Sequence, residues 1–364
     1  MAVSRAKQGI ERIKPHMIGG QADAVPPASI LLNSNESAFG ASPFARQAAR
    51  AAAANIERYV ENVDHFLVPA LAEHFGLDAA RITTGQGSDD LLARLARGYL
   101  GPGTELLRSA NSYLKVPNYA HANDADVVSV PDINFKPSVD ALIAGLTERT
   151  RIVYLANPEN PAGTYLTGAE VRKLHAAMPD TALLVLDCAY EEYVDAPDYE
   201  PGHVLVEEAE NVVMCRTFSK IYGLAGARVG WLYGPEDVVD TARRLALTFP
   251  VASPSVAAVI AAMDDVEHVR SVRAANLEGR CWLTDQMTDL GLEVIPSQTN
   301  FILVHMPDAD FSAAACDTVL RQQGIAIRRM VAPAYRDYIR ITIGHPTDMT
   351  LVRDAIARFL AGAS

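Results

Sequence analysis

The sequence is poor in cysteine, with only four among 364 residues: Cys188, Cys215, Cys281 and Cys316. They lie far apart, and neither a C-x-x-C motif nor the Cys/His spacing of a metal site occurs. We therefore expect no disulfide framework and no bound metal. Isolated cysteines of this kind fit a reducing compartment best, so we expect a cytoplasmic protein.

The sequence also lacks long apolar runs. The longest, such as the run from Val256 to Met263, are too short to cross a membrane. The first residues, MAVSRAKQGIERIK, carry charges throughout and contain no apolar core of an export signal. We expect no association with a membrane.

Positive charge is scarce as well. The chain has 32 Lys and Arg against 44 Asp and Glu, a formal net charge of −12. This excess of negative charge opposes broad attraction to nucleic-acid phosphates or anionic lipid, so we expect no nucleic-acid partner. A local arginine cluster can still bind a small anionic substrate.

The chain is long enough for about two domains at roughly 150 residues each. Short apolar segments alternate with amphipathic ones, as in RITTG before SDDLLARLARGYL and RIVYLAN before GAEVRKLHAAM. This alternation predicts an α/β fold with a mostly parallel sheet between helices, including a helix over SYLKVPNYAHAND. From about Ser253 the pattern changes to long helices and the segments LEVIP, NFILVHM, IAIRR and YIRITIG, which predict a smaller α+β domain.

A glycine-rich segment, Gly85 to Asp90, follows the predicted strand RITTG. It carries Asp90 where a dinucleotide fingerprint has its third glycine, and the chain contains no G-K-[ST], so dinucleotide and P-loop sites are not expected. A glycine-rich turn that opens a helix can bind one phosphate through free backbone N–H groups. An ordinary strand-to-helix turn with Ser88 as N-cap explains the segment equally well on its own.

A second segment, Arg216 to Arg228, reads RTFSKIYGLAGAR and combines two hydroxyls, a lysine and an arginine. Lys220 stands among Phe218, Ile221 and other apolar residues, and a lysine partly removed from water can act as a nucleophile and form a Schiff base. The neighbouring hydroxyl and guanidinium groups suit a phosphate. The alternative is a solvated surface lysine.

Asp187 ends the apolar run LLVLD, so we expect a carboxylate at the carboxyl end of a buried strand. Such a carboxylate requires a cationic partner, and the pyridinium nitrogen of pyridoxal phosphate is one. Tyr190 and Asn160 could donate to the phenolic oxygen of that cofactor. The alternative is that Asp187 caps the next helix.

Near the C-terminus the segment YIRITIG alternates with period two. The isoleucines are expected on one face and Tyr338, Arg340 and Thr342 on the other. An arginine on such a strand beside a cleft can clamp a substrate carboxylate, and the alternative is an exposed charge on an edge strand.

Five motifs in order, GQGSDD, NPENPAGTYL, LLVLDCAYEEY, RTFSKIYGLAGARVGW and YIRITIG, closely resemble the fold-type-I, pyridoxal-phosphate-dependent aminotransferases. Within that family, LLNSNESAFGASP and RTFSKIYGLAG look most like the histidinol-phosphate aminotransferases. The resemblance runs from about Leu31 to Gly344. It implies a segment 1–40 that packs with the small domain, a large cofactor-binding domain 41–255 and a small domain 256–364.

The resemblance also implies cofactor contacts, position by position. Lys220 matches the Schiff-base lysine and Asp187 the partner of the pyridinium nitrogen. Tyr190 and Asn160 match the residues at the phenolic oxygen, and Tyr113 falls where the family stacks an aromatic ring on the cofactor. The positions that match ligands of the cofactor phosphate are Gly87, Ser88, Thr217, Ser219 and Arg228.

On the substrate side, Arg340 matches the carboxylate-binding arginine and Arg328 a further family arginine. Tyr59, in ERYVE, resembles the tyrosine that reaches the phosphate of the neighbouring subunit, which implies a homodimer with shared sites. The implied reaction moves an amino group between amino acids and 2-oxo acids, with glutamate and 2-oxoglutarate as one pair. Lys220 is expected to move the proton between the substrate Cα and the cofactor.

The chain departs from the family pattern in its substrate motifs. It has N-E-S-A, with Ser37, where the family has N-E-N-P, and E-N-P-A-G, with Glu159 and Ala162, where the family has N-N-P-T-G. His16 replaces a tyrosine and is either a phosphate donor or a surface histidine. Alternatives are therefore an aromatic amino-acid or specialised-pathway aminotransferase and, in a different class, a catalytically inactive binding protein.

Overall fold

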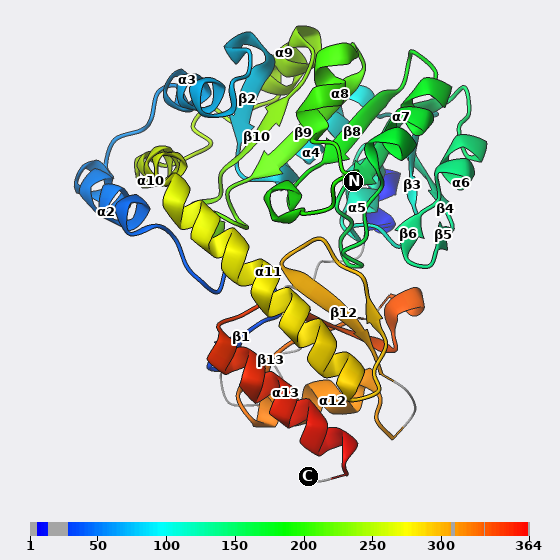
Figure 1. The fold of residues 1–364 in the computed structure, drawn as a ribbon. Helices are drawn as coiled ribbons and strands as arrows, with labels where there is room; N and C mark the ends of the chain where they lie inside the picture. The colour runs from blue at the N-terminus through cyan, green and yellow to red at the C-terminus, as the bar shows by residue number, and fades with distance from the viewer. Residues whose placement is uncertain (1–5, 14–27, 307–309, 331, 363–364) are drawn as a thin grey trace, which may run out of the picture.

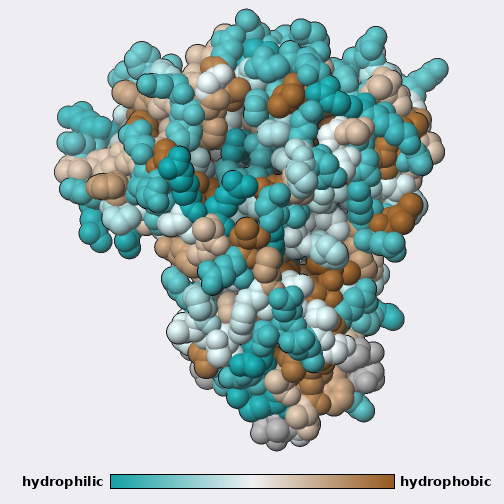
Figure 2. Space-filling model, in the orientation of Figure 1, coloured by the Kyte–Doolittle hydropathy of each residue, from teal (hydrophilic) through white to brown (hydrophobic). Residues whose placement is uncertain are grey.

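The computed structural model describes residues 6–13, 28–306, 310–330 and 332–362. In Figure 1 the chain forms a larger upper body and a smaller lower body, and the long helix α11 (Val266–Asp289) runs from one to the other. Figure 2 shows apolar side chains at the surface where these two bodies meet. No helix among the described residues is both long and apolar enough to cross a membrane.

The larger body is built on a seven-stranded sheet in the order β2-β10-β9-β8-β7-β3-β4. All neighbouring strands pair in parallel except β10, which is antiparallel to β2 and β9. The strands are β2 (Ile82–Gly85), β3 (Glu105–Ser109), β4 (Asp126–Val130), β7 (Thr150–Ala156), β8 (Leu183–Asp187), β9 (Val212–Thr217) and β10 (Gly230–Tyr233). The predicted α/β class is therefore confirmed.

Helices cover both faces of this sheet. Helices α3, α6, α7 and α8 contribute to the core on one face, and α4, α5 and α9 to the core on the other. Their bounds are α3 (Val63–Phe75), α4 (Ser88–Tyr99), α5 (Val116–His121), α6 (Val139–Ala144), α7 (Gly168–Ala177), α8 (Gly202–Glu208) and α9 (Glu236–Arg244). Because both faces are covered, the central strands are mostly apolar, and β8 and β9 end in the polar residues Asp187 and Thr217.

The lower body holds a four-stranded antiparallel sheet in the order β11-β12-β15-β14, packed against α11, α12 and α13. The isoleucines of β15 (Tyr338–Thr342) lie in the core, while Tyr338 packs on the other side with Tyr335, so the predicted alternation is confirmed. The other elements are β11 (Val294–Ile295), β12 (Phe301–His305), β14 (Arg328–Arg329), α12 (Ala313–Gln322) and α13 (Pro346–Leu360).

Two predicted elements differ from the structure. The segment IAIRR is not one strand: β13 (Ile325–Ala326) pairs with β1 (Ile30–Leu31), and β14 pairs with β15 in the other sheet. The helix predicted over 112–124 is only α5, which begins next to Pro117. Proline fits the first turn of a helix but lacks the N–H that a helix interior requires.

The N-terminal part of the chain contacts both bodies. Strand β1 pairs in parallel with β13, whereas in α1 (Gln8–Glu11) the Gly9 N–H donates to Asp124 Oδ1 at 2.6 Å. The division into 1–40, 41–255 and 256–364 stays a prediction. The remaining elements are α2 (Pro43–Ala52), which packs against α10 (Ser253–Asp264), and the hairpin strands β5 (Asp132–Ile133) and β6 (Lys136–Pro137), with short 3-10 turns between.

Candidate active site

A cradle of polar groups lies where β2, β9 and β10 meet, and we call its members Gly87, Ser88, Thr217, Ser219 and Arg228 the anion cradle. Gly230, which starts β10, pairs with the last residues of both β2 and β9. Thr217 Oγ1 donates to Ser219 Oγ at 3.0 Å, and Arg228 Nη1 donates to the same oxygen at 3.1 Å. The structure thus brings together two segments that are far apart in sequence.

Two glycines allow this close packing. Gly87 has a φ of +78°, and a Cβ atom on it would lie 2.6 Å from Arg228 Nη2. A Cβ on Gly230 would lie 2.5 Å from the Ser88 backbone nitrogen. Gly87, not Ser88, is the N-cap of α4 and provides no side-chain cap, so the alternative of a Ser88 cap is wrong and the first N–H groups of the helix stay available.

Asp187 ends β8, and its carboxylate is buried. Oδ2 accepts a hydrogen bond from the Tyr154 hydroxyl at 2.7 Å, whereas Oδ1 has no hydrogen-bond partner among the described residues. Burial raises the pKa of Asp187 to about 6, although the Tyr154 hydrogen bond, the Ala189 backbone N–H and the charge of Lys220 act to lower it. The helix-cap alternative is wrong, because the next helical turn (Glu191–Tyr193) has Tyr190 as its N-cap.

Lys220 lies close to Asp187 and is half-buried rather than solvated. Its Nζ is 3.4 Å from the Ser34 carbonyl oxygen and 5.5 Å from the centre of the Tyr190 ring. The adjoining Phe218 and Ile221 side chains are fully buried. The lysine amine therefore sits at the end of an apolar stretch, within reach of a group placed beside Asp187.

The side chains of Tyr190 and Asn160 each accept a hydrogen bond within the site. The Tyr190 hydroxyl accepts a hydrogen bond from Asn35 Nδ2 at 2.9 Å. Asn160 Oδ1 accepts one from Arg340 Nη1 at 2.8 Å, which connects the loop after β7 with β15 of the lower body. The site is therefore assembled from both bodies.

Tyr113 is held by Asp89, in the first turn of α4. Asp89 Oδ1 accepts hydrogen bonds from Tyr113 at 3.2 Å and Tyr119 at 2.7 Å. Burial and the Asp89 charge raise the pKa of Tyr113. Burial alone would raise the pKa of Asp89, but the hydrogen bond from Tyr119 and the charge of Lys115 outweigh it and the pKa is lowered. Tyr113 is thus neutral and held by a carboxylate.

Two arginines of the lower body, Arg328 and Arg340, lie next to each other at the site. Arg328 of β14 is the direct strand partner of Arg340 in β15. Arg340 is only 7% exposed, and burial lowers its pKa to about 10, with the positive charge of Arg328 adding to the shift. Among the described residues, no carboxylate forms an ion pair with either arginine. Two cations side by side without a counter-ion favour the binding of an anion.

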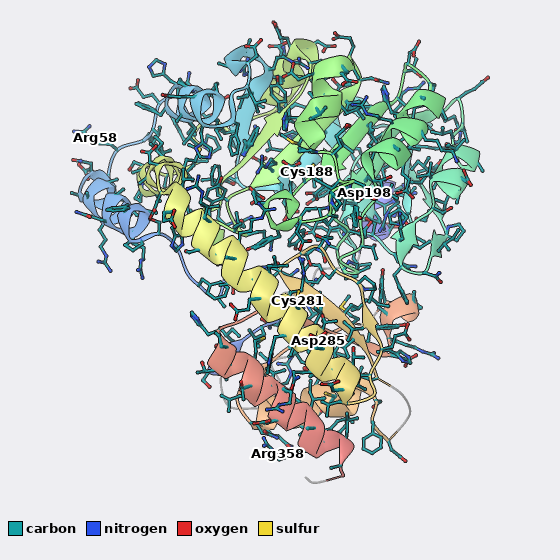
Figure 3. The ribbon with its side chains drawn as sticks, in the orientation of Figure 1. Arg58, Cys188, Asp198, Cys281, Asp285 and Arg358 are labelled. Atoms are coloured by element: carbon teal, nitrogen blue, oxygen red, sulfur yellow. The ribbon has the colours of Figure 1, made fainter. Side chains whose placement is uncertain are left out.

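Of the two remaining predicted site residues, the structure describes only Tyr59, and it lies apart from this assembly. Tyr59 is 74% exposed and stacks on Phe249, with 4.1 Å between the ring centres. Its neighbour Arg58 lies at the outer edge of the molecule beside α2 (Figure 3). His16 lies outside the described residues.

Three residues in the site were not predicted from the sequence. Tyr154 binds Asp187, Asp89 holds Tyr113, and Asn35 binds Tyr190. A tyrosine in the middle of the apolar strand RIVYLAN is a signal, because a buried hydroxyl needs a partner. The sequence does not indicate which residue that partner is, because each of the three hydrogen bonds joins residues from different elements.

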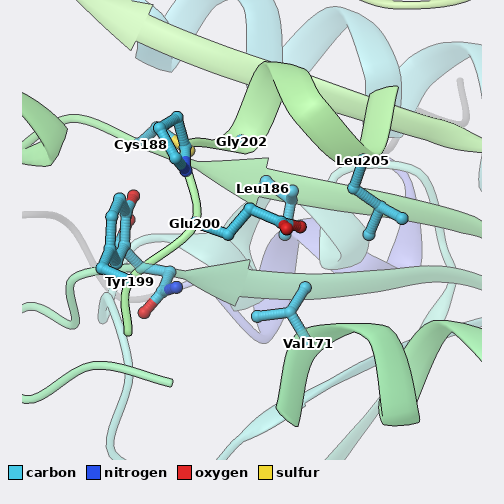
Figure 4. Close-up of a pocket in the computed structure, with 9 residues that line it drawn as sticks. Val171, Leu186, Cys188, Tyr199, Glu200, Gly202 and Leu205 are labelled. Carbon is cyan, nitrogen blue, oxygen red and sulfur yellow. The ribbon is translucent and has the colours of Figure 1, made fainter. Parts of the chain in front are cut away.

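A small cavity lies on the other face of the large sheet (Figure 4), lined by Leu186, Cys188 and other residues under α7 and α8. Leu186 and Cys188 point to that face, and Asp187 between them points to the opposite one. At about 10 Å³ the cavity holds nothing larger than water, so it is not part of the candidate site.

A half-buried lysine, a buried carboxylate and an anion cradle, gathered at the carboxyl edge of an α/β sheet, are typical of an enzyme that binds a phosphorylated cofactor. Residues 27–358 match the family described as Aminotransferase class I and II, and the chain belongs to that family. It is therefore a pyridoxal-phosphate-dependent aminotransferase that acts on amino acids and 2-oxo acids. The predicted family, enzyme class and cofactor are confirmed.

Within the family, the chain is similar to proteins named histidinol-phosphate aminotransferase. It is 43% identical to that of Paramagnetospirillum magneticum, with 99% of each chain covered, and 41% identical to that of Granulibacter bethesdensis, with 100% of this chain and 98% of the relative covered. The crystal structure of histidinol-phosphate aminotransferase from Sinorhizobium meliloti, in complex with pyridoxal-5'-phosphate, has a TM-score of 0.90 at 30% identity, covering 100% of this chain and 99% of that one.

Proposed function

We propose that pyridoxal phosphate is held with its phosphate in the anion cradle and its pyridine ring beside Asp187. The free, buried Oδ1 of Asp187 supports this placement, because a protonated ring nitrogen supplies the cation and the donor that this oxygen lacks. The helix N-terminus and Arg228 supply donors suited to a phosphate dianion. The donor set of the chain thus fits the cofactor.

Pyridoxal phosphate, when bound, takes up the electrons released when the bond between the substrate Cα and its hydrogen breaks. We propose that Lys220 holds the cofactor until the amino donor displaces it, and that the freed amine then takes the proton from the substrate Cα and delivers it to the cofactor. Tyr190 and Asn160 are proposed to donate to the phenolic oxygen, and Tyr113 to stack on the ring. The short separation of Lys220 and Tyr190 supports these roles.

We propose that the amino donor is histidinol phosphate, with glutamate and 2-oxoglutarate as the second pair. The observation that carries this proposal is the arginine pair Arg328 and Arg340, neighbours on paired strands with no carboxylate partner among the described residues. Histidinol phosphate has no carboxylate, so its phosphate dianion is the group that such a pair recognises. Glutamate supplies two carboxylates to the same arginines.

The test is a set of single-turnover half-reactions with histidinol phosphate, glutamate and phenylalanine. One charge-assisted anchor contributes about 1.5–3 kcal/mol, so Arg340→Ala should raise KM for all three donors by roughly 10- to 200-fold. Arg328→Ala should affect histidinol phosphate and glutamate but spare phenylalanine. Arg336→Ala, at an exposed arginine beside Asp337, is the matched control and should change none of them.

Failure of the parent protein to turn over histidinol phosphate would contradict the proposed substrate. Turnover of phenylalanine or tyrosine instead would favour an aromatic amino-acid or specialised-pathway aminotransferase, the second candidate suggested by the sequence changes at His16, Ser37 and Ala162. Absence of bound cofactor and of any turnover would favour an inactive binding protein.

We propose that the active unit is a homodimer in which Tyr59 completes the site of the neighbouring subunit. Exposed apolar side chains support this: Phe249, which stacks on Tyr59, and also Phe44, Ile56, Phe66 and Leu247. An open groove of about 420 Å³, lined by residues 61–64 and 246–248 among others, adjoins this surface. A second copy of the chain would cover it.

A cytoplasmic location stays a prediction. It is supported by the four cysteines, all of which are free in the structure.

A further inference from the structure

Three consecutive residues, Asn33, Ser34 and Asn35, each contact a different group of the candidate site. The Asn33 carbonyl accepts from Arg340 Nη2 at 3.2 Å, and the Ser34 carbonyl accepts from Lys220 Nζ at 3.4 Å. The Asn35 side-chain amide donates to the Tyr190 hydroxyl at 2.9 Å. The first two contacts use backbone oxygens, which any residue offers, whereas the third depends on the side chain of Asn35.

Asn35 is itself held firmly. It is 1% exposed, and its backbone N–H donates to Thr342 Oγ1 at 3.1 Å while the Thr342 hydroxyl donates back to Asn35 Oδ1 at 3.2 Å. Asn300 Nδ2 donates to the Asn35 carbonyl at 3.1 Å. Because Oδ1 accepts from Thr342, the other end of the amide, which can only donate, must face Tyr190.

This arrangement determines which way the Tyr190 hydroxyl points. A hydroxyl has one proton to donate, and Asn35 already supplies the proton of the bond between the two residues. The Tyr190 proton is therefore free for another acceptor, and Tyr190 has none among the described residues. Lys220 Nζ lies 5.5 Å from the centre of the Tyr190 ring, the Phe301 ring packs against that ring edge to face, and Arg340 interacts with Tyr190 through its charge; the Tyr190 hydroxyl donates a hydrogen bond to none of these three residues.

We propose that Asn35 is a positioning residue that keeps Tyr190 as a hydrogen-bond donor toward the phenolic oxygen of pyridoxal phosphate. The inference rests on the proposed role of Tyr190 and adds to it the group that sets the direction of its proton. Asn35 adopts a left-handed φ of +55°, which asparagine tolerates better than most residues. The position therefore suits both the backbone turn and an amide donor.

The experiment reverses this hydrogen bond. In Asn35→Asp the side chain can only accept when ionised, so the Tyr190 proton turns toward it and away from the cofactor. Donation to the phenolic oxygen stabilises its anion, so loss of donation should raise the pH midpoint of the visible absorbance change of the bound cofactor. We expect a rise of about one pH unit, a tenfold change in proton affinity, with kcat lowered and KM for the amino donor unchanged.

A neutral pair of variants separates this effect from that of the added charge. Thr342→Val removes the hydroxyl that orients the Asn35 amide and should shift the midpoint in the same direction, by less. Thr342→Ser keeps the hydroxyl and should leave the midpoint in place. This pair also tests the inference if Asn35→Asp does not fold.

Tyr190→Phe distinguishes the inference from the proposed function beneath it. A Tyr190→Phe midpoint equal to that of the parent would mean that Tyr190 does not donate to the cofactor, and the proposed role itself would be wrong. A shift in Tyr190→Phe with none in Asn35→Asp or Thr342→Val would overturn the role of Asn35 alone. If Asn35→Asp shifts the midpoint equally in the Tyr190→Phe background, the shift comes from the added charge and not from Tyr190. That result would also overturn the proposed role of Asn35.

Discussion

Lys220 is the residue that we propose to carry the chemistry. No other lysine in the sequence lies in a T-x-S-K context, and its amine lies in the site beside Tyr190. We predict that Lys220→Ala folds but loses transamination and the visible absorbance of the lysine-bound cofactor, and that borohydride no longer fixes cofactor to the chain. Lys173→Ala, at an exposed lysine paired with Asp140, should behave like the parent. Cofactor still trapped by borohydride in the Lys220 variant would refute the assignment.

The burial of Glu159 leads to a prediction about how the stability of the protein depends on pH. Its side chain is buried and accepts from Ser112 Oγ at 2.8 Å, and burial raises its pKa to about 8, partly offset by that hydrogen bond and by the charge of Arg108. The folded-state pKa therefore lies above the ordinary value of 4.5, so the protonated form favours folding. Its contribution to the free energy of unfolding is fully present below about pH 4.5 and is lost as the pH rises through about 8.

Glu159→Gln mimics the protonated side chain and keeps the acceptor oxygen. In cofactor-free protein, we expect the Tm of the parent to fall relative to Glu159→Gln by roughly 5 °C between pH 5 and 9, and the difference to level off above that range. Thermal unfolding followed across the pH series measures it. If Tm changes with pH in the same way in the parent and in Glu159→Gln, Glu159 is already ionised at low pH in the folded state.

At the scale of elements, the turn between β2 and α4 depends on a glycine. Gly87 has a positive φ, and an added Cβ would displace the Arg228 guanidinium from the anion cradle. Loss of one charge-assisted contact should raise the Kd of pyridoxal phosphate for cofactor-free Gly87→Ala by about 10-fold or more. Gly226→Ala, where nothing lies within 4 Å of the added atom, is the control.

The same titration with pyridoxal, which has no phosphate, shows whether the loss belongs to the cradle. We expect Gly87→Ala to bind pyridoxal as the parent does. An equal loss for pyridoxal and pyridoxal phosphate would mean that the substitution disturbs the site as a whole rather than its phosphate contacts.

At the scale of the whole molecule, the exposed surface around Tyr59 predicts shared sites. Lys220→Ala and Tyr59→Ala are each expected to be inactive or nearly so, yet a mixed dimer contains one site with both native residues. Random pairing makes about half of the dimers mixed, so equal mixing should restore roughly a quarter of the parent activity. Steady-state activity after subunit exchange measures this. Full activity of a strictly monomeric protein at assay concentration would rule the dimer out.

Local patterns in the sequence were sufficient for part of this structure. The alternation of β15, the buried strand that ends at Asp187 and the glycine-rich turn before α4 follow from periodicity and turn chemistry within one element. The order of five motifs then identified the family and its cofactor. These features were predictable because each depends on residues close together in the chain.

Only the tertiary structure decided which of these residues meet. Asn35 and Tyr190 are 155 positions apart, and Asn160 and Arg340 are 180 apart. The split of IAIRR between two sheets likewise depends on where β1 and β15 lie. No local pattern encodes these pairs, because a hydrogen bond between distant residues exists only once the order of the strands and the packing of the two bodies have brought its donor and acceptor together. For the same reason, the absence of a carboxylate partner for Arg328 and Arg340 among the described residues became visible only in the folded chain.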